Sequence, residues 1–196
     1  MNETVGWYEA NAEDFFQRTF GVGVLPQLRW FADRLPPGAK VLEIGCGAGR
    51  DAKILRDLGF QVTATEASPK LAALARDYAG VEVAVITFDE MAWPDASFDG
   101  IWACASLLHA PRAQLPDLLR RLARALVPGG LFFMSFKHGT QERGANGRRF
   151  TDLDEAGAQA LIAEAGGLSI LTTEVTPDAR PDRPDARWLS LLCRKR

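Results

Sequence analysis

Apolar and polar residues follow two patterns along this chain, one typical of buried strands and the other of helices. Short apolar runs predict strands at residues 41–44, 61–65, 81–86, 99–104, 130–137, 168–175 and 188–193. Apolar residues spaced three or four apart predict helices at 4–19, 24–35, 50–58, 115–126 and 154–165. A further helix is expected to begin at Ser68-Pro69, because serine caps free amides and proline is tolerated in a first turn.

This order of elements predicts an α/β fold built on one mostly parallel sheet. Crossover helices cover both faces of such a sheet and make a Rossmann-like three-layer sandwich. The last two strands lack an intervening helix, so we expect them to pair as an antiparallel hairpin at one edge. From the helix that ends before Gly59, Ile54, Leu55 and Leu58 are expected to face inward. A leucine stripe is assigned to the core: Leu115, Leu118, Leu119, Leu122 and Leu126.

Three alternate glycines follow the first predicted strand and lead directly into a helix. Gly45, Gly47 and Gly49 lack Cβ atoms, so the chain can turn tightly and a nucleoside-type ligand can lie against the peptide groups. The spacing differs from the G-x-G-x-x-G fingerprint of dinucleotide sites. Glu43, two places before the first glycine, would repel a pyrophosphate but suits a ligand with positive charge, such as an ammonium or sulfonium.

A second carboxylate is expected at the same edge of the sheet. The strand Gln61-Val62-Thr63-Ala64-Thr65 ends at Glu66, about the interval at which such folds present an acidic side chain to ribose hydroxyls. In an open α/β sheet the ligand lies outside the carboxyl ends of the strands, beside the first strand. The sequence therefore predicts a small-molecule cofactor site there.

Four separated motifs give the chain a resemblance to a known family: Glu43-Ile-Gly-Cys-Gly-Ala-Gly-Arg50, Glu66, Ser97-Phe98-Asp99-Gly100-Ile101 and Leu126-Val127-Pro128-Gly129-Gly130. In this order they resemble class I S-adenosylmethionine-dependent methyltransferases. The resemblance implies the strand order 3-2-1-4-5-7-6 and in-line methyl transfer from S-adenosylmethionine to a small molecule, with S-adenosylhomocysteine as the product. The stretches Gly49-Arg50-Asp51-Ala52 and Gly147-Arg148-Arg149-Phe150-Thr151-Asp152 look similar to bacterial tellurite-resistance-like methyltransferases.

The resemblance also implies a set of cofactor-binding residues. After the third strand, Phe88 and Asp89 are expected at the adenine, although Thr87 stands near the usual acidic position. The segment Trp7-Tyr8-Glu9-x-Asn11-x-x-x-Phe15-Phe16 resembles a cofactor-covering helix, and an amphipathic helix merely packed on the sheet is the alternative. The expected set is Tyr8, Phe15, Glu43, Gly45, Cys46, Gly47, Gly49, Arg50, Glu66, Ala67, Phe88, Asp89 and Cys104.

Candidate acceptor-side residues follow the fourth and fifth strands. His109 could remove a proton or orient the substrate, or could simply fix the loop before Pro111. With Lys137 and Tyr8 it makes up the predicted catalytic group. The predicted substrate-binding residues are His109, Lys137, His138, Arg148 and Arg149. The basic segment is either a solvated loop paired with Glu142 and Asp152 or a mobile lid that recognises an anionic substrate.

Composition favours one catalytic domain over residues 1–196. Within it, the cofactor-covering helices are assigned to 1–36, the cofactor-binding core to 38–137, and the substrate-side loops to 138–153 and 176–187.

Apolar residues make up 47% of the chain, which argues against disorder, and the net charge of −2 disfavours nucleic acid as a substrate. Residues 1–18 lack the features of a signal peptide, and no apolar run is long enough to cross a bilayer, so a cytoplasmic protein is expected. We expect it to be a monomer or a homodimer. The three cysteines are expected to be reduced thiols, and no metal site is expected.

Two other function classes stay open at this stage. A nicotinamide-dependent oxidoreductase would share the sheet, but the glycine spacing, Glu43 and the terminal hairpin weigh against it. An S-adenosylmethionine-binding module without transferase activity remains compatible, because neither fold nor cofactor proves turnover.

Overall fold

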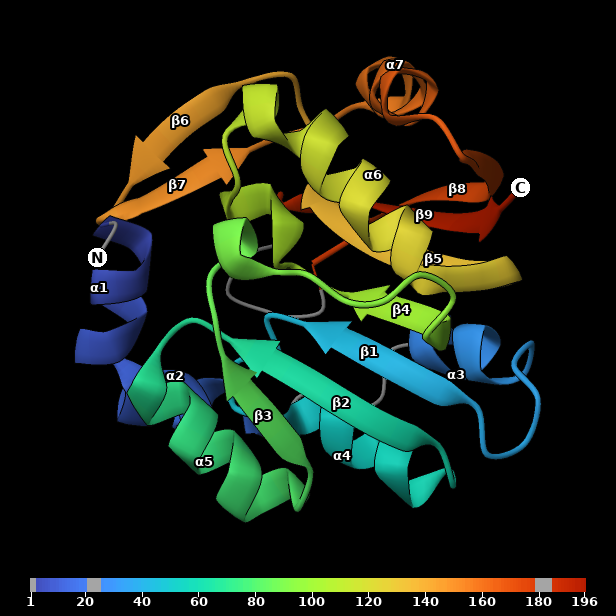
Figure 1. Cartoon of the computed structure of the whole chain (residues 1–196). Helices are drawn as coiled ribbons and strands as arrows, with labels where there is room; N and C mark the ends of the chain where they lie inside the picture. The colour runs from blue at the N-terminus through green and yellow to red at the C-terminus, as the bar shows by residue number, and fades with distance from the viewer. Residues whose placement is uncertain (1–2, 21–25, 179–184) are drawn as a thin grey trace.

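The computed structural model describes residues 3–20, 26–178 and 185–196. Its centre is a seven-stranded sheet in the order β3-β2-β1-β4-β5-β9-β8. Figure 1 shows this twisted sheet between two layers of helices. The strands are β1 (Lys40–Ile44), β2 (Gln61–Glu66), β3 (Glu82–Val85), β4 (Phe98–Ala103), β5 (Leu126–Lys137), β8 (Leu168–Pro177) and β9 (Arg187–Lys195). The pairs among β1 to β5 are parallel, whereas β9 runs antiparallel to both β5 and β8. The predicted strand order and terminal hairpin are confirmed.

Helices cover both faces of the sheet. They are α1 (Glu3–Ala10), α2 (Ala12–Phe20), α3 (Pro26–Ala32), α4 (Arg50–Asp57), α5 (Pro69–Ala79), α6 (Leu115–Ala125) and α7 (Glu155–Ala165). On one face, α6 and α7 pack on Ile101, Phe132 and Met134. On the other, α3 and α4 enclose Val41 and Trp102. No helix in the described part of the chain is both long and apolar enough to span a bilayer.

In the middle of the chain, α4 ends and α5 begins where the sequence predicts. Ser68 caps α5, with its Oγ accepting from the Leu71 N–H at 3.2 Å, and Gly59 follows α4 with φ +92°. The leucine stripe is buried, as expected, but Leu126, predicted as part of the helix, instead begins β5. Leu58, expected to face inward, is instead 51% exposed, because it caps the end of α4 where the helical direction is lost.

At the amino end, the structure divides one predicted helix into two. The segment predicted as 4–19 breaks at Asn11, whose side-chain amide and backbone N–H both donate to the Trp7 carbonyl, at 2.8 and 3.0 Å. The helix predicted over 24–35 ends at Ala32, and residues 24 and 25 lie outside the described part of the chain. Of the loop predicted over 176–187, residues 179–184 also lie outside it.

The segment expected as a substrate-side loop at 138–153 contains a hairpin that the sequence reasoning missed. It consists of β6 (Glu142–Ala145) and β7 (Arg148–Thr151), paired antiparallel. Asn146 and Gly147 form the turn with φ of 50° and 72°, the left-handed pair that a type I′ hairpin requires. The Asn-Gly dipeptide was the signal that could have revealed it. In Figure 1 this hairpin reaches across to α1.

Candidate active site

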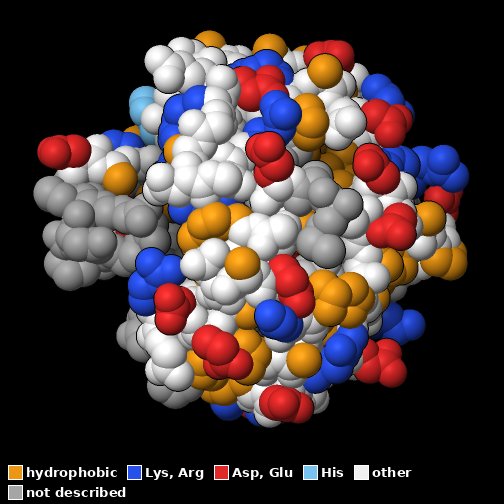
Figure 2. Space-filling view, turned by 90° about the vertical axis from the view of Figure 1, so that its left-hand side faces the viewer, with side chains coloured by type: hydrophobic (Ala, Val, Ile, Leu, Met, Phe, Trp, Pro, Cys, Tyr) orange, Lys and Arg blue, Asp and Glu red, His pale blue; other side chains and the backbone are white. Residues whose placement is uncertain are grey.

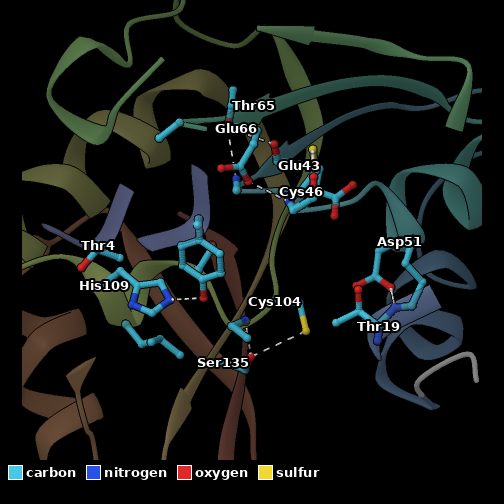
Figure 3. A pocket seen from close by; sticks show the side chains of 18 of the residues that line it. Thr4, Thr19, Glu43, Cys46, Asp51, Thr65, Glu66, Cys104, His109 and Ser135 are labelled. Carbon is cyan, nitrogen blue, oxygen red and sulfur yellow. Dashed lines mark hydrogen bonds and ion pairs between the residues drawn. The ribbon is translucent and has the colours of Figure 1, made fainter. Parts of the chain in front are cut away.

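A cavity of about 330 Å³ opens at the carboxyl ends of the central strands. Its walls come from α1, α2, the glycine loop after β1, the ends of β2, β4 and β5, and the β6–β7 and β8–β9 hairpins. In Figure 3, Glu43, Cys46, Thr65 and Glu66 lie together in one part of it, and His109 lies in another. The cavity therefore has a glycine-loop part and a part bordered by α1 and β7.

The glycine loop approaches the cavity in a backbone conformation suited to glycine. Gly47 lines the cavity with φ +56°, and a Cβ placed there would come within 3.0 Å of the Phe15 ring. Gly49 is needed for packing, because a Cβ there would meet the Ala75 backbone and side chain at 3.0 Å. Gly49 therefore lets α5 pack closely, while Gly47 lets the Phe15 ring lie against the loop.

Glu66 is held at the end of β2 by the backbone around it. Its carboxylate accepts from the Gly47 N–H through one oxygen and from the Ser68 N–H through the other, both at 2.9 Å. Burial raises the pKa of Glu66, while the backbone donors favour the ionised form and oppose that rise. A carboxylate has about four acceptor positions, so these backbone donors still leave room for a ligand donor.

Glu43 is the second acidic group in this part of the cavity. It is only 4% exposed, and its Oε2 has no hydrogen-bond partner among the described residues. Burial, and then the nearby Asp51 charge, raises the pKa of Glu43 well above its ordinary value. A buried carboxyl without a donor is costly, and a positively charged ligand group beside it would lower that cost.

A buried ion pair stands behind these carboxylates. Arg50 donates to both oxygens of Asp51, at 2.7 and 3.0 Å, and Trp102 Nε1 donates to the same carboxylate at 2.9 Å. Burial alone would lower the pKa of Arg50, but Asp51 outweighs it and raises the pKa. The sequence reasoning did not connect Asp51 with Trp102, because 51 residues separate them.

The thiols near the cavity are in the protonated form. Burial raises the pKa of Cys104 to about 12 and that of Cys46 well above its ordinary value. All three cysteines are free of disulfides, as expected. Neither Cys46 nor Cys104 therefore offers a thiolate nucleophile at neutral pH.

His109 and Tyr8 meet across the cavity. The Tyr8 hydroxyl lies 2.9 Å from His109 Nε2, and His109 Nδ1 lies 2.7 Å from the Arg149 carbonyl oxygen. The pKa of His109 is lowered to about 4, mainly by burial; the hydrogen bond to the Arg149 carbonyl opposes this fall, and the charges of Arg148 and Lys137 add to it. The imidazole is therefore neutral at pH 7.

Cations and aromatic rings line the same part of the cavity. The Arg148 guanidinium carbon lies 3.9 Å from the Trp7 ring centroid, and Lys137 Nζ lies 4.8 Å from the Phe150 centroid. Arg148 forms no ion pair with any described residue, and its Nε is buried without a partner among them. By contrast, the Arg149 side chain is exposed and pairs with Glu142 at 2.6 Å.

Most of the predicted site residues line the cavity. Those that do are Tyr8, Phe15, Glu43, Gly45, Cys46, Gly47, Arg50, Glu66, Ala67, Phe88, Cys104, His109, Lys137 and Arg148. Gly49, Asp89, His138 and Arg149 are not among the lining residues. Asp89 is exposed, and His138 pairs with Glu155 at 3.0 Å.

Residues 41–130 match the family described as "Methyltransferase domain". The chain is 33% identical over 130 residues to a 2-methyl-6-phytyl-1,4-hydroquinone methyltransferase from Synechocystis, covering 63% of this chain and 40% of that protein. It is 36% identical over 116 residues to a ubiquinone biosynthesis O-methyltransferase from Xanthomonas axonopodis, covering 56% of this chain and 48% of that protein. The chain thus spans less than half the length of these two curated relatives.

A solved structure extends the likeness over nearly the whole chain. The Burkholderia thailandensis 1,6-didemethyltoxoflavin-N1-methyltransferase, with bound S-adenosylhomocysteine, matches with a TM-score of 0.77 at 23% identity, covering 97% of this chain and 86% of that one. Fold and cavity together define an α/β protein with a cavity at the carboxyl ends of its central strands. Over residues 41–130, this chain is therefore similar to the methyltransferase domain family, and the two curated relatives are methyltransferases.

Proposed function

We propose that this chain binds S-adenosylmethionine in the glycine-loop part of the cavity and transfers its methyl group to a small anionic molecule in the other part. The observation that carries the proposal is the pair of buried carboxylates, Glu66 and Glu43, beside a glycine loop that lines the cavity. A ligand with a ribose diol and positive charge satisfies both carboxylates. A pyrophosphate would lie against them and be repelled.

In this proposal, each residue of the glycine-loop part contacts a different group of the cofactor. Glu66 accepts from the ribose hydroxyls, Glu43 faces the positively charged amino-acid end, and Phe88 stands at the adenine. Phe15 of α2 covers the loop from the side of Gly47. When bound, S-adenosylmethionine supplies a methyl group already activated by the positive sulfonium. The protein then has mainly to align the acceptor and exclude water.

The other part of the cavity suits an anion. Arg148 stacks on Trp7 and lies against Phe150, its guanidinium carbon 5.3 Å from that ring centroid, so it is oriented without a carboxylate partner among the described residues. Lys137 adds a second positive charge at the end of β5. An acceptor with a carboxylate or similar group would bind there with charge-assisted hydrogen bonds. This attraction is local, because Figure 2 shows acidic and basic side chains intermixed over the side of the molecule that α1 occupies.

Calorimetry with S-adenosylhomocysteine and NAD tests the cofactor assignment. We expect the former to bind and the latter not to, followed by S-adenosylhomocysteine release when small carboxylates are screened as acceptors. Gly47→Ala should weaken binding, because the new Cβ would come within 3.0 Å of the Phe15 ring and push that ring away from the glycine loop. Gly38→Ala is the matched control, since Gly38 also has positive φ (+74°) but no atom within 4 Å of the new Cβ. Both substitutions carry left-handed strain of about 1–2 kcal/mol. Equal affinity in the two variants would contradict the placement.

A further inference from the structure

The hydrogen bond between Tyr8 and His109 has a definite donor and acceptor, which follow from the Arg149 carbonyl at the other ring nitrogen. A backbone carbonyl only accepts hydrogen bonds, so His109 Nδ1, 2.7 Å from the Arg149 oxygen, carries the proton of the neutral ring. Nε2 then holds a lone pair and accepts from the Tyr8 hydroxyl at 2.9 Å. The Tyr8 oxygen, having given its only proton to this bond, can offer a ligand nothing but lone pairs.

This direction persists at neutral pH. Burial keeps the imidazole uncharged, and the positive charges of Arg148 and Lys137 oppose its protonation. The Tyr8 ring is also held in place, edge-on to Phe15 at 5.2 Å, while Phe150 lies 5.2 Å from the His109 ring centroid. The oxygen is thus fixed between the cover of the glycine loop and the β6–β7 hairpin.

We infer that Tyr8 and His109 form a proton-accepting pair, and that the acceptor is an anionic molecule whose nucleophilic atom carries a proton as a hydroxyl or N–H. This inference rests on the proposed function and narrows its substrate class. A pre-ionised nucleophile, such as a thiolate or a chalcogen oxyanion, would meet lone pairs at Tyr8 instead of a donor. The anionic group of the acceptor lies toward Arg148, and its O–H or N–H points at Tyr8.

The proton transfer balances without a further reactant. The nucleophile's lone pair forms a bond to the methyl carbon, and the electrons of the breaking carbon–sulfur bond pass to sulfur, which becomes neutral. The nucleophile's proton moves to the Tyr8 oxygen while the Tyr8 proton moves to His109 Nε2, leaving an imidazolium that loses its proton to water. A weakly basic histidine suffices, because the oxygen or nitrogen becomes strongly acidic as its bond to carbon forms.

The tautomer can be measured without any acceptor. Nitrogen-15 NMR of the imidazole rings should show His109 neutral at pH 7, with a protonated Nδ1 and an Nε2 resonance that shifts in Tyr8→Phe. His138, the other histidine of the chain, serves as the internal comparison. A His109 ring that carries its proton on Nε2 would overturn the inference, because Tyr8 would then accept from it.

Turnover supplies the second test, with benzoates that carry a hydroxyl, amino or sulfanyl group at the same ring position as probes. We expect the wild-type protein to methylate hydroxyl or amino members, and Tyr8→Phe and His109→Asn to lower their kcat by about 100-fold. The affinity for S-adenosylhomocysteine should change by less than about twofold. Asparagine keeps a donor for the Arg149 carbonyl but removes Nε2. Glu13→Gln, at an exposed position of α2, is the control and should change neither quantity.

The outcomes separate this inference from the function on which it rests. Turnover of sulfanyl probes alone would overturn the inference, as would a protein that binds S-adenosylhomocysteine yet methylates none of the hydroxyl or amino probes. If the two variants lowered kcat for the sulfanyl probes as much as for the hydroxyl and amino probes, the pair would have a structural role, and the inference would also be overturned. Absence of S-adenosylhomocysteine binding would instead refute the proposed function.

Discussion

Glu66→Gln tests the cofactor assignment at a carboxylate that backbone N–H groups hold in place. Glutamine has nearly the same size, so the packing at the end of β2 should persist. The wild-type carboxylate accepts from the Gly47 and Ser68 N–H groups, one on each oxygen. The amide has only one oxygen, and its NH2 group must face one of these two donors.

The magnitude of the effect follows from the bonds that change. Loss of charge-assisted hydrogen bonds to the ribose hydroxyls should weaken binding of S-adenosylhomocysteine by about 1.5–3 kcal/mol. That range corresponds to a dissociation constant raised by roughly 10- to 150-fold. The buried donor left facing the amide should also lower the free energy of unfolding, by about 1–3 kcal/mol.

Isothermal titration calorimetry with S-adenosylhomocysteine measures the first effect, and urea unfolding followed by tryptophan fluorescence measures the second. Glu82→Gln is the matched control, because Glu82 is exposed at the start of the neighbouring strand β3. It should leave both quantities unchanged. A dissociation constant in Glu66→Gln within about twofold of the wild-type value would refute the reasoning, because the ribose would then lie elsewhere.

Three further outcomes follow from the same geometry. Because the pKa of His109 falls to about 4 on folding, the protein should lose on the order of 2 kcal/mol of stability as pH drops from 6.5 toward 4, and His109→Asn should flatten this slope in urea titrations. Arg148→Gln should raise the acceptor KM about 10-fold without changing cofactor affinity, whereas the exposed Arg124→Gln should change neither. Trp102→Phe should cost about 1–2 kcal/mol of unfolding free energy, since Asp51 loses a buried donor; an unchanged urea midpoint would contradict this.

The fold could be predicted because its determinants are local. Each strand and helix shows its own periodicity, Ser68 and Gly59 mark element ends by their backbone chemistry, and the final hairpin follows from a missing helix. The predicted elements were wrong where the local sequence pattern was weak or was overlooked. The helix predicted over 4–19 breaks at Asn11, and the left-handed turn at Asn146 and Gly147 lies in a segment predicted as a loop.

The candidate site was predictable residue by residue but not as an arrangement. Glycine spacing and strand ends indicated the position of the cavity, since parallel strands bring their carboxyl ends to one edge. The pairing of Tyr8 with His109 joins residues 101 positions apart, and no periodicity reports on such a contact. The stacking of Arg148 on Trp7 likewise depends on how α1 meets the β6–β7 hairpin.

The amino-terminal segment forms a wall common to both parts of the cavity. On the glycine-loop side, Glu9 accepts from Ser68 Oγ at 2.6 Å, next to the backbone that holds Glu66. On the other side, the Thr4 hydroxyl accepts from the Arg149 N–H at 3.0 Å, in the strand whose carbonyl orients His109. Because these contacts lie within two turns of one helix, a shift of α1 that opens either side disturbs the other. The binding of cofactor and acceptor should therefore be coupled through α1, since the ligand that binds first favours the helix position that the second requires.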